Sequence, residues 1–80
     1  MEIRVLRYFL AIAREENMTR AAERLHISQP SLSKEIKKLE EELDHELFIR
    51  TNKNMLLNDE GKIEVTFCRK RSVARNVIQQ

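Results

Sequence analysis

The sequence predicts a mainly α-helical domain with one small β-hairpin. Apolar residues recur at helical spacing over most of the 80 residues, and only one glycine and one proline interrupt them. Near residue 50 the pattern changes to two short strand-like runs. The length permits one small domain, and a composition of 41% hydrophobic and 35% charged residues excludes collagen-like and low-complexity chains.

The first two predicted helices occupy the N-terminal third of the chain. Residues 3–15 form one helical stripe made by Ile3, Leu6, Phe9, Leu10 and Ala13. A polar break follows, in which either Asn17 or Thr19 can cap the second helix. That helix is short, ends near His26 and carries Ala21 and Ala22, whose small side chains allow a close crossing with a neighbouring helix.

A third helix is predicted to start after the turn Ile27-Ser28. Ser28 is a good N-cap, and Pro30 falls in the first turn, where its missing N–H costs little. The apolar stripe of this helix consists of Leu32, Ile36, Leu39 and Leu43. Its opposite side carries Gln29, Pro30, Ser33, Lys34 and Lys37.

The hairpin is predicted from residues 47–50 and 54–57, which are two short apolar runs. The turn between them is the polar run Thr51-Asn52-Lys53, in which asparagine tolerates turn geometry. The helical pattern then resumes.

The last helix has the least regular pattern. Asn58 can cap it, and the acidic residues that follow lie favourably at its positive end. Residues 63–67 alternate with period two, as a strand would, but the residues after them fit a helix. We predict a helix whose apolar stripe is interrupted by Arg69-Lys70-Arg71. Gly61, near its start, predicts the close approach of another helix.

A short helix, a tight turn and a second helix with an apolar stripe make a helix-turn-helix. The residues expected to lock its two helices together are Leu25, Ile27, Leu32 and Ile36. Their packing leaves the far face of the second helix free to enter the major groove of DNA, which is wide enough to admit one helix.

The first turns of that helix contain the candidate base-binding residues. Gln29 can pair with adenine, Lys34 with guanine and Ser33 with several bases, while the ring of Pro30 can contact a thymine methyl. The candidate phosphate-binding groups are the helix N-terminus and the hydroxyls of Ser28 and Ser31.

The charge distribution permits nucleic-acid binding without requiring it. The net charge is +2, and an acidic block over residues 40–46 lies between two basic segments. In a second interpretation, Lys34, Lys37 and Lys38 form an ordinary solvated face, with Glu41 and Glu42 as partners one turn along the helix.

The stretch from Phe9 to Leu57 resembles a known family. The run from Thr19 to Ser33 is similar to the signature of LysR-type transcription regulators, and Ile36–Leu43 and Leu47–Arg50 continue the similarity without a gap. Asn58-Asp59-Glu60-Gly61 resembles the start of the family's linker helix. The chain therefore resembles the N-terminal DNA-binding domain of a bacterial LysR-type regulator.

The resemblance implies a winged helix-turn-helix bound to double-stranded promoter DNA. It implies that the third helix lies in the major groove and that the hairpin, as the wing, reaches the neighbouring minor groove or backbone through Arg50, Thr51 and Lys53. Arg50 has a second interpretation, in which it braces the hairpin by pairing with the acidic block. The complete predicted DNA-binding set is Thr19, Ser28, Gln29, Pro30, Ser31, Ser33, Lys34, Lys37, Arg50, Thr51 and Lys53.

The resemblance also implies a division of the chain and an assembly. Residues 1–58 would form the winged helix-turn-helix, and residues 59–80 the start of a truncated or altered linker and dimerisation helix. The family forms homodimers and often tetramers. Because the stripe is interrupted, we expect the isolated chain to dimerise weakly, with frayed order after about residue 68. The chain is either a fragment of a longer regulator with an effector domain or a short protein with an altered tail.

Other features exclude several classes of function. No acid, base or nucleophile set indicates an enzyme, and His26 and His45 lack ligand spacing, so we expect no metal and no cofactor. The lone Cys68 cannot form an intramolecular disulfide, which favours a reducing cytoplasm. No run reaches the roughly 18 apolar residues of a membrane span, and Arg4 and Arg7 shorten the apolar N-terminal run below that of a signal peptide.

Three alternatives to a LysR-type regulator stay open. One is another winged-helix regulator without an effector domain. Another is a winged-helix module that docks a protein partner and never binds DNA. A third, membrane binding by residues 62–78, is disfavoured because the charged residues of that segment do not segregate onto one face.

Overall fold

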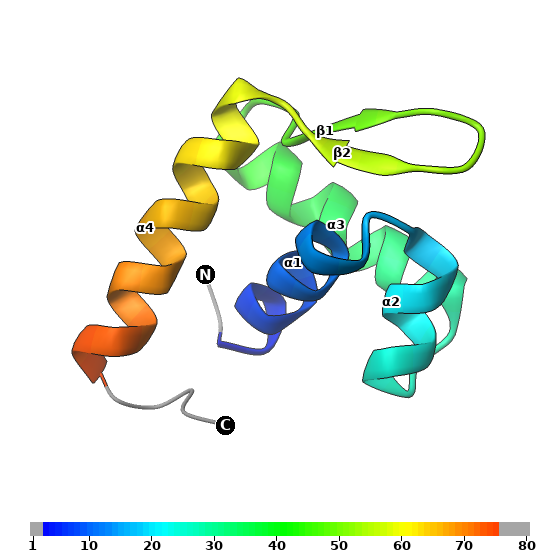
Figure 1. The fold of residues 1–80 in the computed structure, drawn as a ribbon, viewed down its shortest axis with the longest axis horizontal. Helices are drawn as coiled ribbons and strands as arrows, with labels where there is room; N and C mark the ends of the chain where they lie inside the picture. Colours follow the sequence, from blue (N-terminus) through cyan, green and yellow to red (C-terminus); the bar gives the residue numbers. More distant parts are fainter. Residues whose placement is uncertain (1–2, 76–80) are drawn as a thin grey trace.

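The computed structural model describes residues 3–75, and the side chains of residues 3–70, as four helices and a two-stranded antiparallel hairpin (Figure 1). The elements are α1 (Ile3–Glu15), α2 (Met18–Leu25), α3 (Gln29–Leu43), β1 (Phe48–Arg50), β2 (Met55–Leu57) and α4 (Asp59–Arg75). This order confirms the predicted mainly α-helical fold with a hairpin between the third and fourth helices. No helix among the described residues combines the length and apolar character needed to cross a membrane.

One hydrophobic core joins the helices to the hairpin. Phe9 and Ile12 of α1 and Ile36 of α3 are fully buried in it. The ring of Phe9 meets that of Phe48 in β1 edge to face, with centroids 5.6 Å apart. The hairpin therefore rests on the core through β1 and does not stand free.

The short helix α2 has a defined residue at each end. The Oδ1 of Asn17 accepts the Arg20 N–H at 2.8 Å, so Asn17, and not Thr19, is the cap that the sequence left open. At the other end His26 adopts a left-handed conformation with φ of 60°. Ala21, fully buried, lies in the core that α1, α2 and α3 share, which agrees with the close crossing expected of a small side chain.

The recognition-helix candidate α3 buries its predicted stripe. The buried members of that stripe are Leu32, Ile36 and Leu39, and Leu43 is partly buried. Ser28 caps the start of α3, Pro30 lies in its first turn, and Asp44 ends it with φ of 64°. Because the stripe faces the core, the polar side of the helix faces outward.

The hairpin forms the predicted wing. Phe48 pairs with Leu57 at its base, and two further cross-strand pairs lead to the turn. The turn is closed twice, by the Thr51 N–H on the Asn54 carbonyl at 3.0 Å and by the Asn54 N–H on Thr51 Oγ1 at 2.9 Å. These bonds make residues 51–54 a compact tip.

The start of α4 is held tightly against the base of the hairpin. Asn58 caps the helix, because its Oδ1 accepts the Gly61 N–H at 2.7 Å. A Cβ atom on Gly61 would collide with the carbonyl oxygen of Leu47, in the segment before β1. The close approach predicted at Gly61 is therefore present, but the prediction of a helix as the neighbour was wrong.

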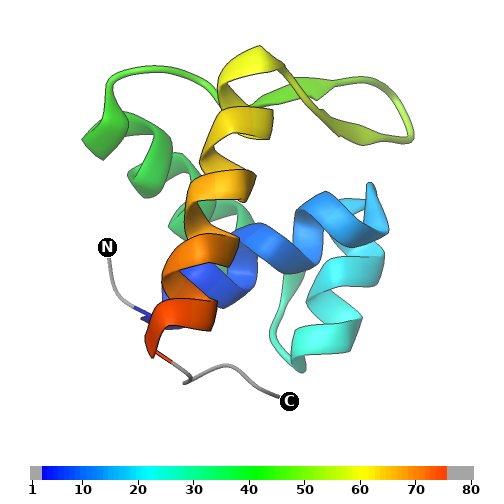
Figure 2. The same ribbon diagram turned by 60° about the vertical axis from the view of Figure 1, so that its left-hand side comes forward.

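Helix α4 packs on the domain through one narrow side. Val65 and Cys68 are buried in the core, whereas Ile63 is 70% exposed and Phe67 is 55% exposed. Figure 2 shows α4 crossing in front of the N-terminal part of α1. The alternation over residues 63–67 thus reflects two sides of a helix, one facing the core and one facing solvent.

The backbone of α4 continues as a helix to Arg75. The interrupted apolar stripe predicts that order frays after about residue 68. Lysine and arginine are good helix formers, so such an interruption removes packing without breaking the helix. Val77 and Ile78, two members of the predicted stripe, lie outside the described residues.

Candidate nucleic-acid interface

The first half of α3 presents a continuous polar face to solvent. Gln29, Pro30, Lys34 and Lys37 are exposed, and Ser33 is half-buried. They lie opposite the stripe that faces the core, so their outward position follows from the burial of that stripe. The predicted base-binding residues are therefore brought together on one surface.

The two serines at the start of α3 have different roles. The Oγ of Ser28 accepts the Ser31 N–H at 3.2 Å and donates to the Oγ of Ser31 at 2.8 Å. The hydroxyl of Ser28 is thus used inside the helix cap. Because Ser31 Oγ accepts in that pair, its own hydrogen stays available for an external acceptor such as a phosphate.

The lysines of α3 do not pair with the acidic residues one turn along the helix. Among the described residues, the structure places no salt bridge between Lys37 and Glu41 or between Lys38 and Glu42. The interpretation of these lysines as paired members of a solvated face is therefore not supported. Their ammonium groups remain free to attract an anion.

A groove separates the polar face of α3 from the wing. Its lining comes from the start of α2, the first turns of α3 and the tip of the hairpin: Asn17, Met18, Thr19, Gln29, Ser33, Arg50, Thr51, Asn52, Lys53, Asn54 and Met55. Six predicted residues, from α2, α3 and the hairpin, thus converge in one depression: Thr19, Gln29, Ser33, Arg50, Thr51 and Lys53. The sequence did not predict Asn17, Asn52 and Asn54 as part of it, because neutral residues in a turn give no local signal of a shared groove.

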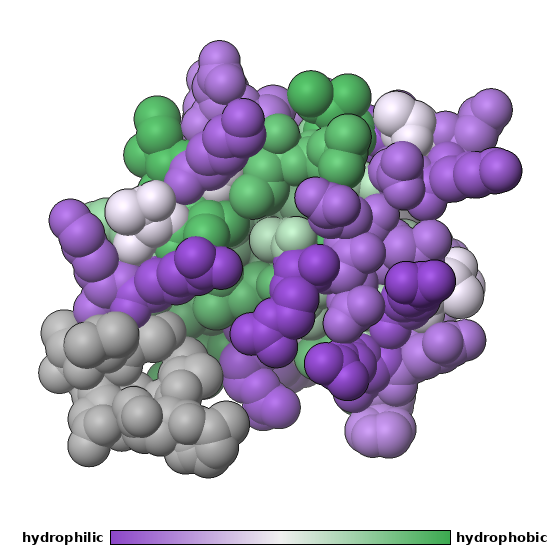
Figure 3. All heavy atoms as spheres, viewed as in Figure 1, coloured by the Kyte–Doolittle hydropathy of each residue, from purple (hydrophilic) through white to green (hydrophobic). Residues whose placement is uncertain are grey.

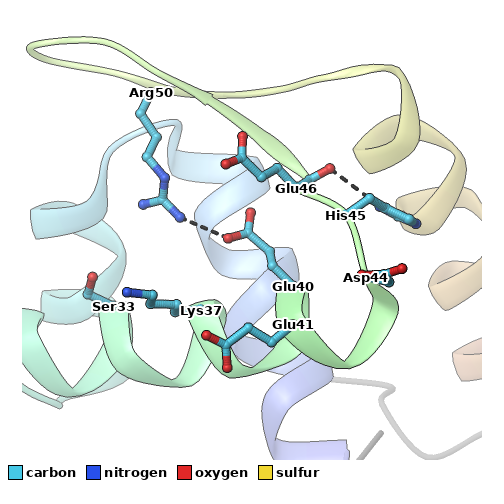
Figure 4. Close-up of a pocket in the computed structure, with 8 residues that line it drawn as sticks. All are labelled: Ser33, Lys37, Glu40, Glu41, Asp44, His45, Glu46 and Arg50. Atoms are coloured by element: carbon cyan, nitrogen blue, oxygen red, sulfur yellow. Dashed lines mark hydrogen bonds and ion pairs between the residues drawn. The ribbon is translucent and has the colours of Figure 1, made fainter.

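Arg50 lines this groove, but its guanidinium points toward Glu40 (Figure 4). Its Nη2 donates to Glu40 Oε1 at 3.0 Å, and its Nη1 lies 3.7 Å from Met55 Sδ. The other carboxylate oxygen of Glu40 accepts the Leu47 N–H at 2.9 Å. This geometry is that of the second interpretation, in which Arg50 braces the hairpin against the acidic block.

Glu40 is the member of the acidic block that pairs with Arg50. Its relative exposure is 8%, and it accepts bonds from both the wing and the segment before it. The available signal was its position four residues after Ile36, which places it beside the buried stripe. A carboxylate in that position needs a cationic partner, and Arg50 supplies it.

The acidic block forms a second depression at the end of α3. Its lining residues are Ser33, Lys37, Glu40, Glu41, Asp44, His45, Glu46 and Arg50 (Figure 4). Excess negative charge there disfavours a polyanion, whereas the groove beside the wing tip contains no acidic residue. Within the part of the chain that the structure describes, no group of acidic, histidine or cysteine side chains could hold a metal ion.

The arrangement of helices, wing and polar face is matched by a known family. The sequence model described as bacterial regulatory helix-turn-helix protein, lysR family, matches residues 3–62. The chain belongs to the LysR family. The predicted non-enzymatic class agrees with this family membership, because the family and the relatives named below are regulators.

Curated LysR relatives share substantial identity with this chain. The regulator BudR of Klebsiella aerogenes is 53% identical over 62 residues, which are 78% of this chain and 43% of BudR. The regulator XapR of Escherichia coli strain K12 is 46% identical over 78 residues, which are 96% of this chain and 26% of XapR. The chain thus spans less than half the length of either relative.

Solved LysR-type structures share the fold. The DNA-binding domain of BenM, crystallised with benA site 1 DNA, has a TM-score of 0.88 and 38% identity, with 95% of this chain and 88% of that chain covered. The CbnR domain in its DNA complex has a TM-score of 0.84 and 35% identity, with 95% and 94% covered. The winged helix-turn-helix predicted from the sequence is therefore confirmed.

Proposed function

We propose that this chain is the DNA-binding domain of a bacterial LysR-type transcription regulator that recognises specific sequences in double-stranded promoter DNA in the cytoplasm. The observation that supports it most is the exposed polar face of α3, with unpaired lysines, beside a groove that ends at the wing tip. The similar BenM and CbnR domains were solved as complexes with DNA. Membership of the LysR family supports the regulatory role.

In the proposed mode of binding, α3 enters the major groove and the wing lies at the adjacent minor groove or backbone. The proposed base contacts are made by Gln29, Pro30, Ser33 and Lys34. The proposed phosphate and backbone contacts are made by Thr19, Ser31, Lys37, Thr51 and Lys53. The groove between α3 and the wing would then receive the sugar-phosphate backbone that separates the two grooves of DNA.

Ser28 and Arg50 take indirect roles in this proposal. Ser28 orients Ser31, since its own hydroxyl is used in the cap. The guanidinium of Arg50 is held by Glu40, so it aligns the wing more than it neutralises phosphate.

The proposal is tested by selecting bound sequences from a random duplex pool and titrating the selected duplex with salt. Because three exposed lysines, Lys34, Lys37 and Lys53, would displace counterions, the logarithm of the binding constant should fall with the logarithm of salt at about −0.9 per phosphate contacted. No enriched sequence, together with a flat response to salt, would favour the alternative of a protein-docking module.

We also propose that residues 1–58 form the DNA-binding unit and that residues 59–80 begin a linker and dimerisation helix. Ile63 and Phe67 form an exposed apolar surface on α4 that a second copy can cover. One such surface is small, so the isolated chain should dimerise weakly and bind adjacent half-sites cooperatively. Sedimentation over a dilution series checks this, and a dimer that persists at nanomolar concentration would contradict it.

A further inference from the structure

Asn17 makes two hydrogen bonds that point in different directions. Its Oδ1 accepts the Arg20 N–H at 2.8 Å and caps α2. Its Nδ2 donates to the carbonyl oxygen of Lys53, at the wing tip, at 3.2 Å. A single half-buried side chain therefore joins the start of the helix-turn-helix to the tip of the hairpin.

The residue before Asn17 adds a second tie to the same hairpin. Glu16 adopts a left-handed conformation with φ of 55°, and its carbonyl oxygen accepts the Met55 N–H at 3.0 Å. Met55 is buried, so this bond fixes the start of β2. It does not fix the turn before β2, where Lys53 lies.

The wing tip needs such a tie because it has little packing of its own. Residues 51–54 are all exposed, and a two-stranded hairpin is marginally stable in water. The Thr51 and Asn54 bonds close the turn on itself but do not attach it to the helices. Among the described residues, the bond from Asn17 is the only hydrogen bond shown between this tip and a helix-turn-helix residue.

We propose that Asn17 is a positioning residue for DNA binding, which holds the wing tip so that Lys53 faces the same DNA segment as α3. This inference rests on the proposed function, since it assigns a role in the same interface. Asn17, Lys53 and Gln29 all line the groove between α3 and the wing. Fixing the carbonyl of Lys53 fixes the point from which its flexible side chain extends, and so lowers the entropy lost when the ammonium meets a phosphate.

The chemistry of asparagine separates this role from capping. A helix cap needs only an acceptor, which serine or aspartate also provides. Holding a carbonyl at the same time needs a donor, and the asparagine amide has both. Asn17→Ser therefore keeps the cap and removes the tie, while Asn17→Ala removes both.

The chain contains a matched control at the opposite end of the hairpin. Asn58 caps α4 through Oδ1 and donates from Nδ2 to the Glu46 carbonyl at 2.9 Å. Asn58→Ser makes the same chemical change, away from the groove beside the wing tip. It should leave both the mobility of residues 51–54 and the contribution of Lys53 to DNA binding as they are.

The test is a double-mutant cycle of Asn17→Ser and Lys53→Ala, with affinity measured on the selected duplex. We expect Asn17→Ser to weaken binding by about threefold to tenfold, the range of one neutral hydrogen bond, and to have little further effect when Lys53 is already replaced. Unfolding by urea should show little change for Asn17→Ser and a clear loss for Asn17→Ala. In the free protein, backbone NMR order parameters at residues 51–54 should fall in Asn17→Ser and stay unchanged in Asn58→Ser.

Two results would overturn the inference while leaving the proposed function intact. One is salt-sensitive, sequence-specific binding that Asn17→Ser does not change. The other is an equal loss of affinity with and without Lys53, which would mean that Asn17 acts on DNA independently of the wing. Absence of any salt-sensitive duplex binding by the wild-type chain would overturn the proposed function, and this inference with it.

Discussion

The two long helices, α3 and α4, use their apolar residues in different ways. α3 buries its stripe through Leu32, Ile36 and Leu39 and exposes mainly polar groups, with Pro30 among them in the first turn. α4 buries Val65 and Cys68, whereas Ile63 is 70% and Phe67 is 55% exposed. Figure 3 shows hydrophobic surface beside α4 and at the base of the hairpin, with hydrophilic side chains of α4 around it, and mainly hydrophilic surface over α2.

This difference indicates what each helix can bind. A helix whose apolar stripe is used by its own core offers a partner mainly polar and charged contacts, which suit DNA. A helix with exposed apolar residues is stabilised when another apolar surface covers them. The comparison thus separates a DNA-facing helix from a protein-facing helix within one small domain.

One pair of identical substitutions tests this comparison with the largest expected effect. Ile36→Ala should lower the free energy of unfolding by about 2–5 kcal/mol, because it leaves a cavity in the core. Ile63→Ala should change the free energy of unfolding of the monomer by less than about 0.5 kcal/mol, because Ile63 is already exposed. Urea denaturation at low protein concentration measures both.

Dimerisation should be affected more by Ile63→Ala than by Ile36→Ala. Ile63→Ala should shift the monomer–dimer equilibrium toward monomer in a sedimentation series. Equal losses of monomer stability from the two substitutions would mean that α4 packs on its own domain through Ile63, and the comparison would fail.

Gly61→Ala should give the next largest effect. The added methyl group would meet the Leu47 carbonyl, which belongs to the backbone and cannot move aside easily. We expect a loss of about 1–3 kcal/mol in the free energy of unfolding. Thermal unfolding measures it, and Lys62→Ala, at an exposed neighbouring position, is the control. An unchanged melting temperature for Gly61→Ala would show that α4 is not anchored at its start.

The outcomes at these positions show how far the sequence alone could go. The cap, stripe and exposed side of α3 were all predictable, since each depends on residues within one or two helical turns. The neighbour of Gly61 was not predictable, because a glycine at a helix start indicates a close approach but not which segment approaches. The sequence also did not predict which side of α4 faces the core. Ile63 and Val65 are both apolar, and only the fold shows that Val65 is the buried one.

The candidate site shows the same limit. Gln29, Ser33 and Lys34 were predicted from the geometry of a single helix. Arg50 had two interpretations, because its charge suits phosphate and carboxylate equally. Only the folded position of Glu40 distinguishes them.

Arg50 and Lys53 therefore form a second comparison, with smaller expected effects. Lys53→Ala should reduce the slope of binding against salt by about 0.9, the value for one phosphate contact. Arg50→Ala should change that slope less and should lower stability by about 1 kcal/mol, because Glu40 loses a partner. Salt titrations of the selected duplex, with urea denaturation, measure both quantities. A full unit of slope lost from Arg50→Ala alone would show that its guanidinium leaves Glu40 to bind phosphate.

The central claim is that the outer face of α3 recognises bases, and repeating the duplex selection with Gln29→Ala tests it most directly. Because Gln29 is exposed at the first turn of α3, the variant should lose base preference at one defined position of each half-site. The affinity difference between bases there should shrink by about 1–3 kcal/mol, while preferences elsewhere and the slope against salt persist. An unchanged selected motif would contradict the account, since it would mean that the face of α3 opposite the core does not recognise bases through this turn.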